Sequence, residues 1–84
     1  MVRGRERIKL VGKVIAKPTL VIVPNGIGCK VPVEVRSDAK TGYDSYDIIV
    51  TKSRKPWNVK LGTKVIAVGI LQGDTLWADY FREY

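Results

Sequence analysis

The sequence predicts a small all-β protein, a barrel of five strands with little or no helix. Apolar residues alternate with period two along most of the chain, short turn sequences join neighbouring segments, and no stretch has the spacing of a long amphipathic helix. The chain has 84 residues, of which 45% are hydrophobic. This length and composition are typical of one folded domain over residues 1–84, with residues 1–6 as a flexible basic arm.

The longest predicted element is a β-ribbon over residues 8–36, folded back at Asn25–Gly26. Asn-Gly between two apolar runs is typical of a two-residue hairpin turn. Such a turn sets a register with one apolar face, because successive side chains of a strand point to opposite faces. The expected pairs are Ile22 with Cys29, Leu20 with Val31, Pro18 with Val33, Ala16 with Val35, Lys17 with Glu34, and Lys13 with Asp38.

The remaining strands follow the same alternation. Gly12 interrupts the apolar side of the first segment, and a glycine inside a strand often marks a bend at a barrel corner. Residues 37–45 are polar and read as a loop, and residues 52–63 combine a proline with turn residues, which argues against a full helix. The third, fourth and fifth strands are expected over residues 46–51, 64–71 and 75–82.

The net charge is +7, from fifteen Lys and Arg against eight Asp and Glu. This excess is typical of nucleic-acid binders, although it also fits an acidic protein or an anionic membrane surface. No apolar run approaches the roughly 20 residues that cross a bilayer, and no signal peptide is evident. The single cysteine, Cys29, falls on the expected core face. We therefore expect a cytoplasmic protein without membrane attachment.

Catalytic motifs are missing from the sequence. The chain has no histidine and one cysteine, which excludes the usual zinc spacings and the commonest general base. There is no glycine-rich phosphate loop, nucleophile motif or pair of carboxylates at catalytic spacing. The sequence predicts no enzyme, no metal site and no cofactor.

Basic and aromatic residues stand close together in several segments. Binding of a single strand needs both kinds, because cations follow the phosphates and flat rings stack on bases, with about 1–3 kcal/mol per stacked base. The residues expected to contact phosphate are Arg3, Arg5, Lys40, Lys52, Arg54 and Lys55. The residues expected to stack on bases are Tyr43, Trp57 and Trp77.

Structural roles remain open for some of these residues. Trp57 fits a plug at one barrel end as well as a stacking platform, and residues 1–6 fit a solvated arm as well as a phosphate contact. Trp77 and Tyr80 have opposite strand parity, so one of the two is expected to face inward. The aromatic residues expected in the core are Tyr46 and Phe81.

The order of short motifs resembles a known family. The stretch Ile8-Lys9-Leu10-Val11-Gly12-Lys13-Val14, followed by Pro18 and then by Pro24-Asn25-Gly26, is similar to the opening of the family of bacterial single-stranded DNA-binding proteins and primosomal replication protein N. Residues 46–50 resemble its third strand, and residues 61–69 resemble the entry to its fourth. The resemblance covers about Ile8 to Tyr80.

The resemblance implies an OB-fold barrel that binds single-stranded DNA through basic and aromatic groups on its face and in its hairpin loops. It also implies association into dimers or tetramers, often through the first strand. Two departures stand out. Residues 52–63 are shorter than the family's segment and lack its helix, and the chain ends at Tyr84 without the acidic tail of the replicative members.

The function that the sequence predicts is non-catalytic binding of single-stranded nucleic acid, with DNA favoured over RNA, by a homodimeric OB-fold protein. An accessory role in DNA replication, restart or repair fits best, with replication proteins of the primosome type as further partners. Two alternatives stay open, an OB-fold protein–protein interaction module and an RNA-binding protein of the translation machinery.

Overall fold

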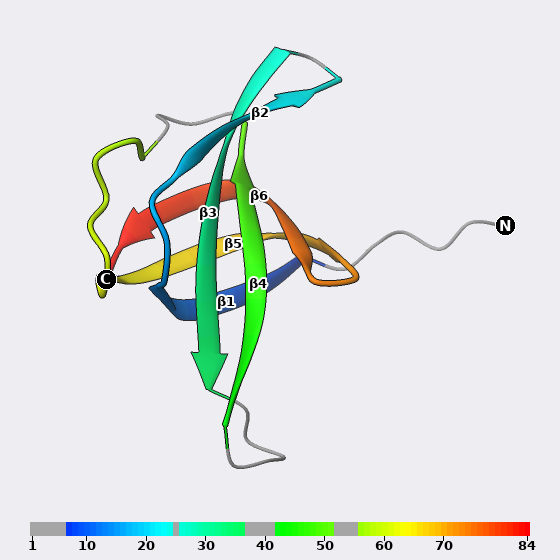
Figure 1. Cartoon of the computed structure of the whole chain (residues 1–84). Coiled ribbons are helices and arrows are strands. Elements are labelled where there is room, and N and C mark those ends of the chain that lie inside the picture. Colours follow the sequence, from blue (N-terminus) through cyan, green and yellow to red (C-terminus); the bar gives the residue numbers. More distant parts are fainter. Residues whose placement is uncertain (1–6, 25, 37–41, 52–55) are drawn as a thin grey trace, which may run out of the picture.

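The computed structural model describes residues 7–24, 26–36, 42–51 and 56–84. These residues form a barrel without helices (Figure 1). Its strands are β1 (Arg7–Val14), β2 (Thr19–Val23), β3 (Gly26–Arg36), β4 (Tyr43–Val50), β5 (Lys64–Gln72) and β6 (Thr75–Glu83). Because β1 and β2 are two parts of the first expected strand, the predicted all-β barrel of five strands is confirmed.

The strands are hydrogen-bonded in the order β1-β5-β6-β4-β3-β2, and a further pairing of β1 with β3 closes the barrel. All neighbours are antiparallel except β4 and β6, which run parallel. The core is built from alternate residues of these strands, and the largest fully buried side chains include Ile48 and Leu76. Cys29 is buried, and Tyr46 and Phe81 pack against the core, as predicted.

The predicted corner at Gly12 is confirmed. β1 pairs with β5 from Arg7 to Lys13, and its last residues, Lys13 and Val14, also pair with β3. An ideal Cβ at Gly12 would lie 2.9 Å from the carbonyl oxygen of Glu34. A side chain at position 12 would therefore hold β1 away from β3, which is where the barrel closes.

The predicted hairpin forms, but its register is wrong by two residues. Val23 pairs with Gly26, so Pro24 and position 25 connect β2 to β3 in place of positions 25 and 26. Asn25 itself lies outside the described residues. The observed pairs in β2 and β3 are Thr19 with Lys30, Leu20 with Cys29, Val21 with Gly28, Ile22 with Ile27, and Val23 with Gly26.

Packing on the outer side of the hairpin explains this register. An ideal Cβ at Gly28 would lie 3.2 Å from Cγ1 of Val23 and 3.2 Å from Cγ2 of Ile49. The observed register therefore seats Val23 and Ile49, both buried, around a position without a side chain. This contact between strands outweighs the local preference of Asn-Gly for the centre of the turn.

The other predicted pairs of the ribbon are also wrong, because the ribbon is interrupted at residues 15–18. Glu34 lies opposite Lys13 rather than Lys17, and Val33 lies opposite Val14 rather than Pro18. Val35 pairs with Asp44 of β4 and not with Ala16. Asp38, the predicted partner of Lys13, lies outside the described residues.

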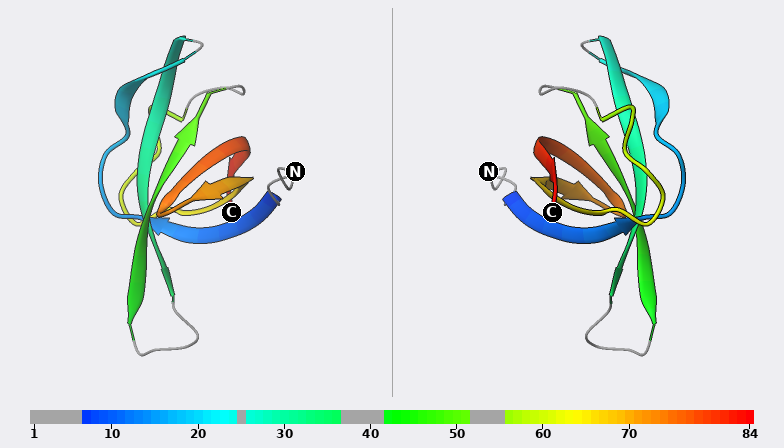
Figure 2. Two further views of the ribbon diagram at one scale, coloured as in Figure 1. Left: turned by 90° about the vertical axis from the view of Figure 1, so that its right-hand side faces the viewer. Right: turned by 90° about the vertical axis from the view of Figure 1, so that its left-hand side faces the viewer.

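The hairpin of β2 and β3 extends past the barrel (Figures 1 and 2). Leu20 and Ile22 were expected on the core face, yet both are exposed, and 87% of Ile22 is accessible. Leu20 and Ile22 do share a face with Cys29, as predicted, because Leu20 lies directly opposite Cys29 and Ile22 is two residues further along the same strand. That face loses its cover where the hairpin leaves the barrel, so the prediction of burial is wrong.

A β-bulge in β6 corrects the expectation for Trp77 and Tyr80. Gly69 pairs with Ala78 whereas Val68 pairs with Tyr80, so one residue of β6 is extra at this point. The alternation of inward and outward side chains is therefore reversed beyond the bulge. As a result Trp77 and Tyr80 both face outward, with 36% and 44% of their surfaces exposed.

The bulge yields a prediction for Gly69→Ala. A Cβ at position 69 would overlap the carbonyl oxygen of Trp77 and lie 2.7 Å from Cα of Ala78. These are backbone atoms that cannot rotate away, so we expect a loss of about 3 kcal/mol in the free energy of unfolding, measured by urea denaturation. The control is Gly73→Ala, where no atom lies within 4 Å and only the positive φ of 63° is strained. Its expected cost is about 1 kcal/mol, and equal losses in both variants would contradict the prediction.

Candidate nucleic-acid interface

The outer face of β3 and β4 carries alternate residues of both strands. Tyr43, predicted to lie in a loop and to stack on bases, is the first residue of β4 and is 61% exposed. The four pairs of this face are Arg36 with Tyr43, Glu34 with Ser45, Pro32 with Asp47, and Lys30 with Ile49. The two basic residues lie at the two ends of the face, and the two acidic residues lie between them.

Trp77, the second predicted stacking residue, continues this face onto β6. It lies opposite Ile49 of β4 and opposite Ile70 of β5, so its indole is surrounded by aliphatic neighbours. A row of paired residues thus crosses four strands at this level. The row consists of Thr19 in β2, Lys30 in β3, Ile49 in β4 and Trp77 in β6.

An ion pair connects the bulge beside Trp77 to the first strand. The Nε and a terminal nitrogen of Arg7 donate to the two carboxylate oxygens of Asp79 at 3.1 and 2.5 Å. The hydrogen bond to Asp79, and then its negative charge, raise the pKa of Arg7. Both side chains are largely exposed, so this ion pair contributes little to the free energy of unfolding.

The structure separates Tyr43 from Trp77. Ile49, the neighbour of Trp77, lies six residues after Tyr43 in the same strand. At the rise of an extended strand this is about 20 Å. The two rings therefore stand at opposite ends of the face, and a bound strand would have to follow β4 to reach both.

Trp57, the third predicted stacking residue, lies in the loop that leads into β5. The loop turns where the Val59 N–H donates to the Pro56 carbonyl, with an N···O distance of 3.3 Å. Val59 is buried in the core cluster, whereas 46% of Trp57 is exposed. The side chain that closes this barrel end is thus Val59, and Trp57 is available to a ligand. No helix forms over residues 56–63, as predicted.

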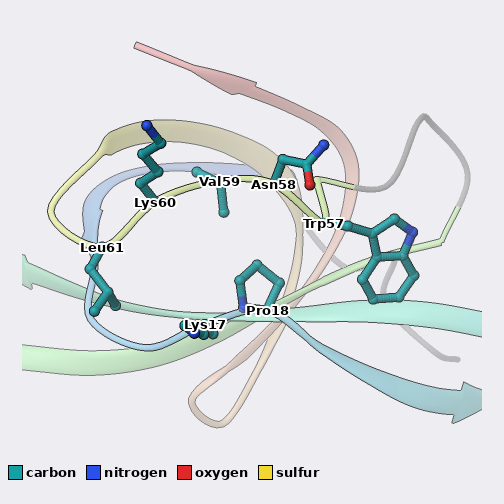
Figure 3. Close-up of a pocket in the computed structure, with 7 residues that line it drawn as sticks. All are labelled: Lys17, Pro18, Trp57, Asn58, Val59, Lys60 and Leu61. Atoms are coloured by element: carbon teal, nitrogen blue, oxygen red, sulfur yellow. The ribbon is translucent and has the colours of Figure 1, made fainter.

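Trp57 forms one end of an open groove of about 570 Å³ between its loop and the segment that joins β1 to β2. Figure 3 shows Pro18 lying between Trp57 and Leu61. The lining residues are Lys17, Pro18, Trp57, Asn58, Val59, Lys60 and Leu61. The two lysines were not predicted as binding residues, because the predicted register paired Lys17 with Glu34 and because Lys60 lies far from Lys17 in the chain.

The six residues expected to contact phosphate lie outside the described residues and stay predictions. They are Arg3, Arg5, Lys40, Lys52, Arg54 and Lys55. Within the described ranges, no group of three or more His, Cys, Asp or Glu side chains is placed to hold a metal ion. The same residues contain no helix long and apolar enough to cross a membrane.

Solved structures with a similar fold are single-stranded DNA-binding proteins and a primosomal protein. The small single-stranded DNA-binding protein of Streptomyces coelicolor matches 99% of this chain and 96% of its own, with a TM-score of 0.72 and 16% identity. The mitochondrial single-stranded DNA-binding protein Rim1 of Saccharomyces cerevisiae matches 98% and 97%, with a TM-score of 0.71 and 14% identity.

PriB of Ralstonia solanacearum matches 93% of this chain and 96% of its own, with a TM-score of 0.60 and 13% identity. No protein-family model and no curated protein sequence matches the chain. The similarity is therefore one of architecture, and it agrees with the family that the sequence motifs indicated. The chain has the OB fold, the barrel found in the single-stranded DNA-binding proteins and PriB that it resembles.

Proposed function

We propose that this protein binds single-stranded DNA across the outer face of β3 and β4 and the adjoining part of β6. The observation that carries the proposal is the pair of exposed rings, Tyr43 and Trp77, on the outer face that OB folds use for oligonucleotides. The net charge of +7 supplies the attraction for phosphates. The similar proteins of Streptomyces coelicolor and Saccharomyces cerevisiae are single-stranded DNA-binding proteins, which supports DNA over RNA.

The charges on this face suggest how a strand would lie. Lys30 and Arg36 stand at the ends, beside Ile49 and Tyr43, and can attract phosphates there. Glu34 and Asp47 lie between them and would repel phosphates, so bases rather than phosphates should face the middle. Arg3, Arg5, Lys40, Lys52, Arg54 and Lys55 are proposed as further phosphate contacts.

We further propose a non-catalytic, accessory role in DNA replication, restart or repair, in contact with replication proteins. The likeness to PriB, a protein of similar length, supports an accessory factor. A protein of this kind would hold single strands for the enzymes that act on them, which needs moderate affinity and little sequence preference. Stacking and phosphate contacts supply binding of that kind.

The proposal predicts salt-dependent binding that depends on Trp77. For Trp77→Ala we expect a loss of about 1–3 kcal/mol in binding free energy toward oligo-dT, measured by fluorescence anisotropy of a labelled strand. The logarithm of the association constant should fall with the logarithm of salt concentration, with a slope of about −0.7 per phosphate contacted. Tyr84→Ala is the control, since Tyr84 is exposed and lies outside this face. It follows β6, and the Nζ of Lys64, the first residue of β5, lies 5.3 Å from its ring centre. An affinity that does not change with salt concentration would contradict the proposal, and so would an equal loss of binding free energy in Trp77→Ala and Tyr84→Ala.

We propose that the chain forms a homodimer along the open edge of β1. The Val14 N–H donates to Thr63 and its carbonyl accepts from Gly62, so Val14 is bonded on the β5 side. The alternation of an antiparallel strand then turns the backbone groups of Lys9 and Val11 away from β5. A second β1 can pair with these groups about a twofold axis.

The dimer predicts a specific effect of Val11→Pro. This change removes an N–H that faces away from β5, and proline is tolerated on such an edge. We expect the variant to stay folded by circular dichroism but to sediment as a monomer. Val11→Thr, which keeps the N–H, should remain dimeric. A wild-type protein that sediments as a monomer at every concentration tested would refute the dimer.

A further inference from the structure

We propose that the groove beside Trp57 holds one nucleotide of the bound strand, with the base stacked on the indole and the adjoining phosphates near Lys17 and Lys60. This inference rests on the proposed binding of single-stranded DNA and adds to it a second contact site at the end of the barrel. It also assigns a role in binding to Lys17, Pro18 and Lys60.

The groove combines the chemical groups that a nucleotide needs. Trp57 offers an accessible ring face, and the ring of Pro18 and the side chain of Leu61 add apolar surface along the floor (Figure 3). The amide of Asn58 can both donate to and accept from the edge of a base. The volume of about 570 Å³ falls within the range of small-ligand sites.

Charge favours a phosphate in the groove more than on the face of β3 and β4. The groove lining contains two lysines and no carboxylate. The described outer face of β3 and β4 carries Lys30 and Arg36 together with Glu34 and Asp47, so its charges cancel. A phosphate that follows a base into the groove therefore meets an uncompensated positive potential.

The groove is joined to the proposed binding face by the chain at Pro18 and Thr19. Pro18 directly precedes Thr19, which pairs with Lys30, and Lys30 pairs with Ile49 beside Trp77. This row crosses the strands over three interstrand spacings, about 14 Å in all. A strand that lies along the row runs from Trp77 over Lys30 to Pro18 and enters the groove at Trp57. The distance from Trp77 across the sheet to Thr19, about 14 Å, is shorter than the route of about 20 Å along β4 to Tyr43.

An acidic peptide is the other occupant that two lysines could attract. A peptide carboxylate would satisfy the ammonium groups but would leave the open ring face of Trp57 without a flat partner. A nucleotide uses the ring, the amide and the lysines together. The geometry therefore favours nucleic acid, and the peptide becomes an outcome of the test.

The test uses the two tryptophans of the chain as separate reporters. Trp77→Phe leaves Trp57 as the reporter of the groove, and Trp57→Phe leaves Trp77 as the reporter of the face. Both variants are titrated at low salt with a series of oligo-dT strands of increasing length. The series begins at about four nucleotides, the lower limit of the site size of one OB domain. We expect oligo-dT to quench the fluorescence of both tryptophans. The shortest strand that quenches Trp57 should be equal in length to the shortest strand that quenches Trp77, or one step longer in the series.

A charge variant adds a second readout. The double change Lys17→Gln with Lys60→Gln should weaken binding about tenfold and should reduce the salt slope by about 0.7 for each phosphate that loses its lysine. The matched control is Lys9→Gln with Lys64→Gln, which removes the same charge from the outer side of β1 and β5. Its salt slope should stay closer to that of the unaltered protein.

The outcomes separate the groove from the proposed function. If neither tryptophan responds and the strand does not bind, the proposed function fails and the groove with it. If Trp77 responds and Trp57 does not at any strand length, the groove inference is overturned while single-strand binding stands. If polyglutamate quenches Trp57 as strongly as oligo-dT at equal salt, the groove accepts acidic chains and the assignment to nucleic acid is wrong.

Discussion

The close approach of β1 to β3 at Gly12 determines how the rest of the chain is arranged. Beyond that point the backbone is held on both sides, since Val14 exchanges hydrogen bonds with residues 62 and 63 and the Ile15 N–H donates to the Pro32 carbonyl. These contacts fix the start of the 15–18 segment and the end of the loop before β5. The two walls of the groove are therefore positioned by the same contact that closes the barrel.

The bulge in β6 has a comparable double role. It lets Phe81 reach the core after Ala78 while Trp77 and Tyr80 both stay at the surface. Without the bulge, the alternation of side chains would have turned one of these two rings inward. The bulge thus allows a full core and an aromatic surface within nine residues of strand.

Much of the fold follows from local pattern. Period-two alternation located the strands, and a glycine within an apolar stretch marked the corner at Gly12. The hairpin register did not follow, because the packing of Val23 and Ile49 around Gly28 involves residues far apart in the chain and outweighs the turn preference of Asn-Gly. The parity rule failed at Trp77 and Tyr80 for a similar reason, since the bulge depends on Gly69 in the neighbouring strand.

The candidate site was predictable only in part. Tyr43, Trp57 and Trp77 are all exposed, which a stacking role requires, although the outward position of both Trp77 and Tyr80 did not follow from strand parity. The groove was not predictable, because its walls come from segments about forty residues apart that meet only through barrel closure. A prediction of Lys17 would have required knowing that the ribbon is interrupted before Pro18.

The hairpin that extends past the barrel has a consequence for how chains meet in concentrated solution. β2 is the last strand in the sheet order, and its five residues, from Thr19 to Val23, are uncharged. Such an edge is a template for pairing between molecules, and natural proteins shorten it with prolines. Pro18 and Pro24 stand directly before and after β2, so a foreign strand can add hydrogen bonds over a few residues only. The hairpin can thus present apolar side chains to solvent without offering a long edge for aggregation.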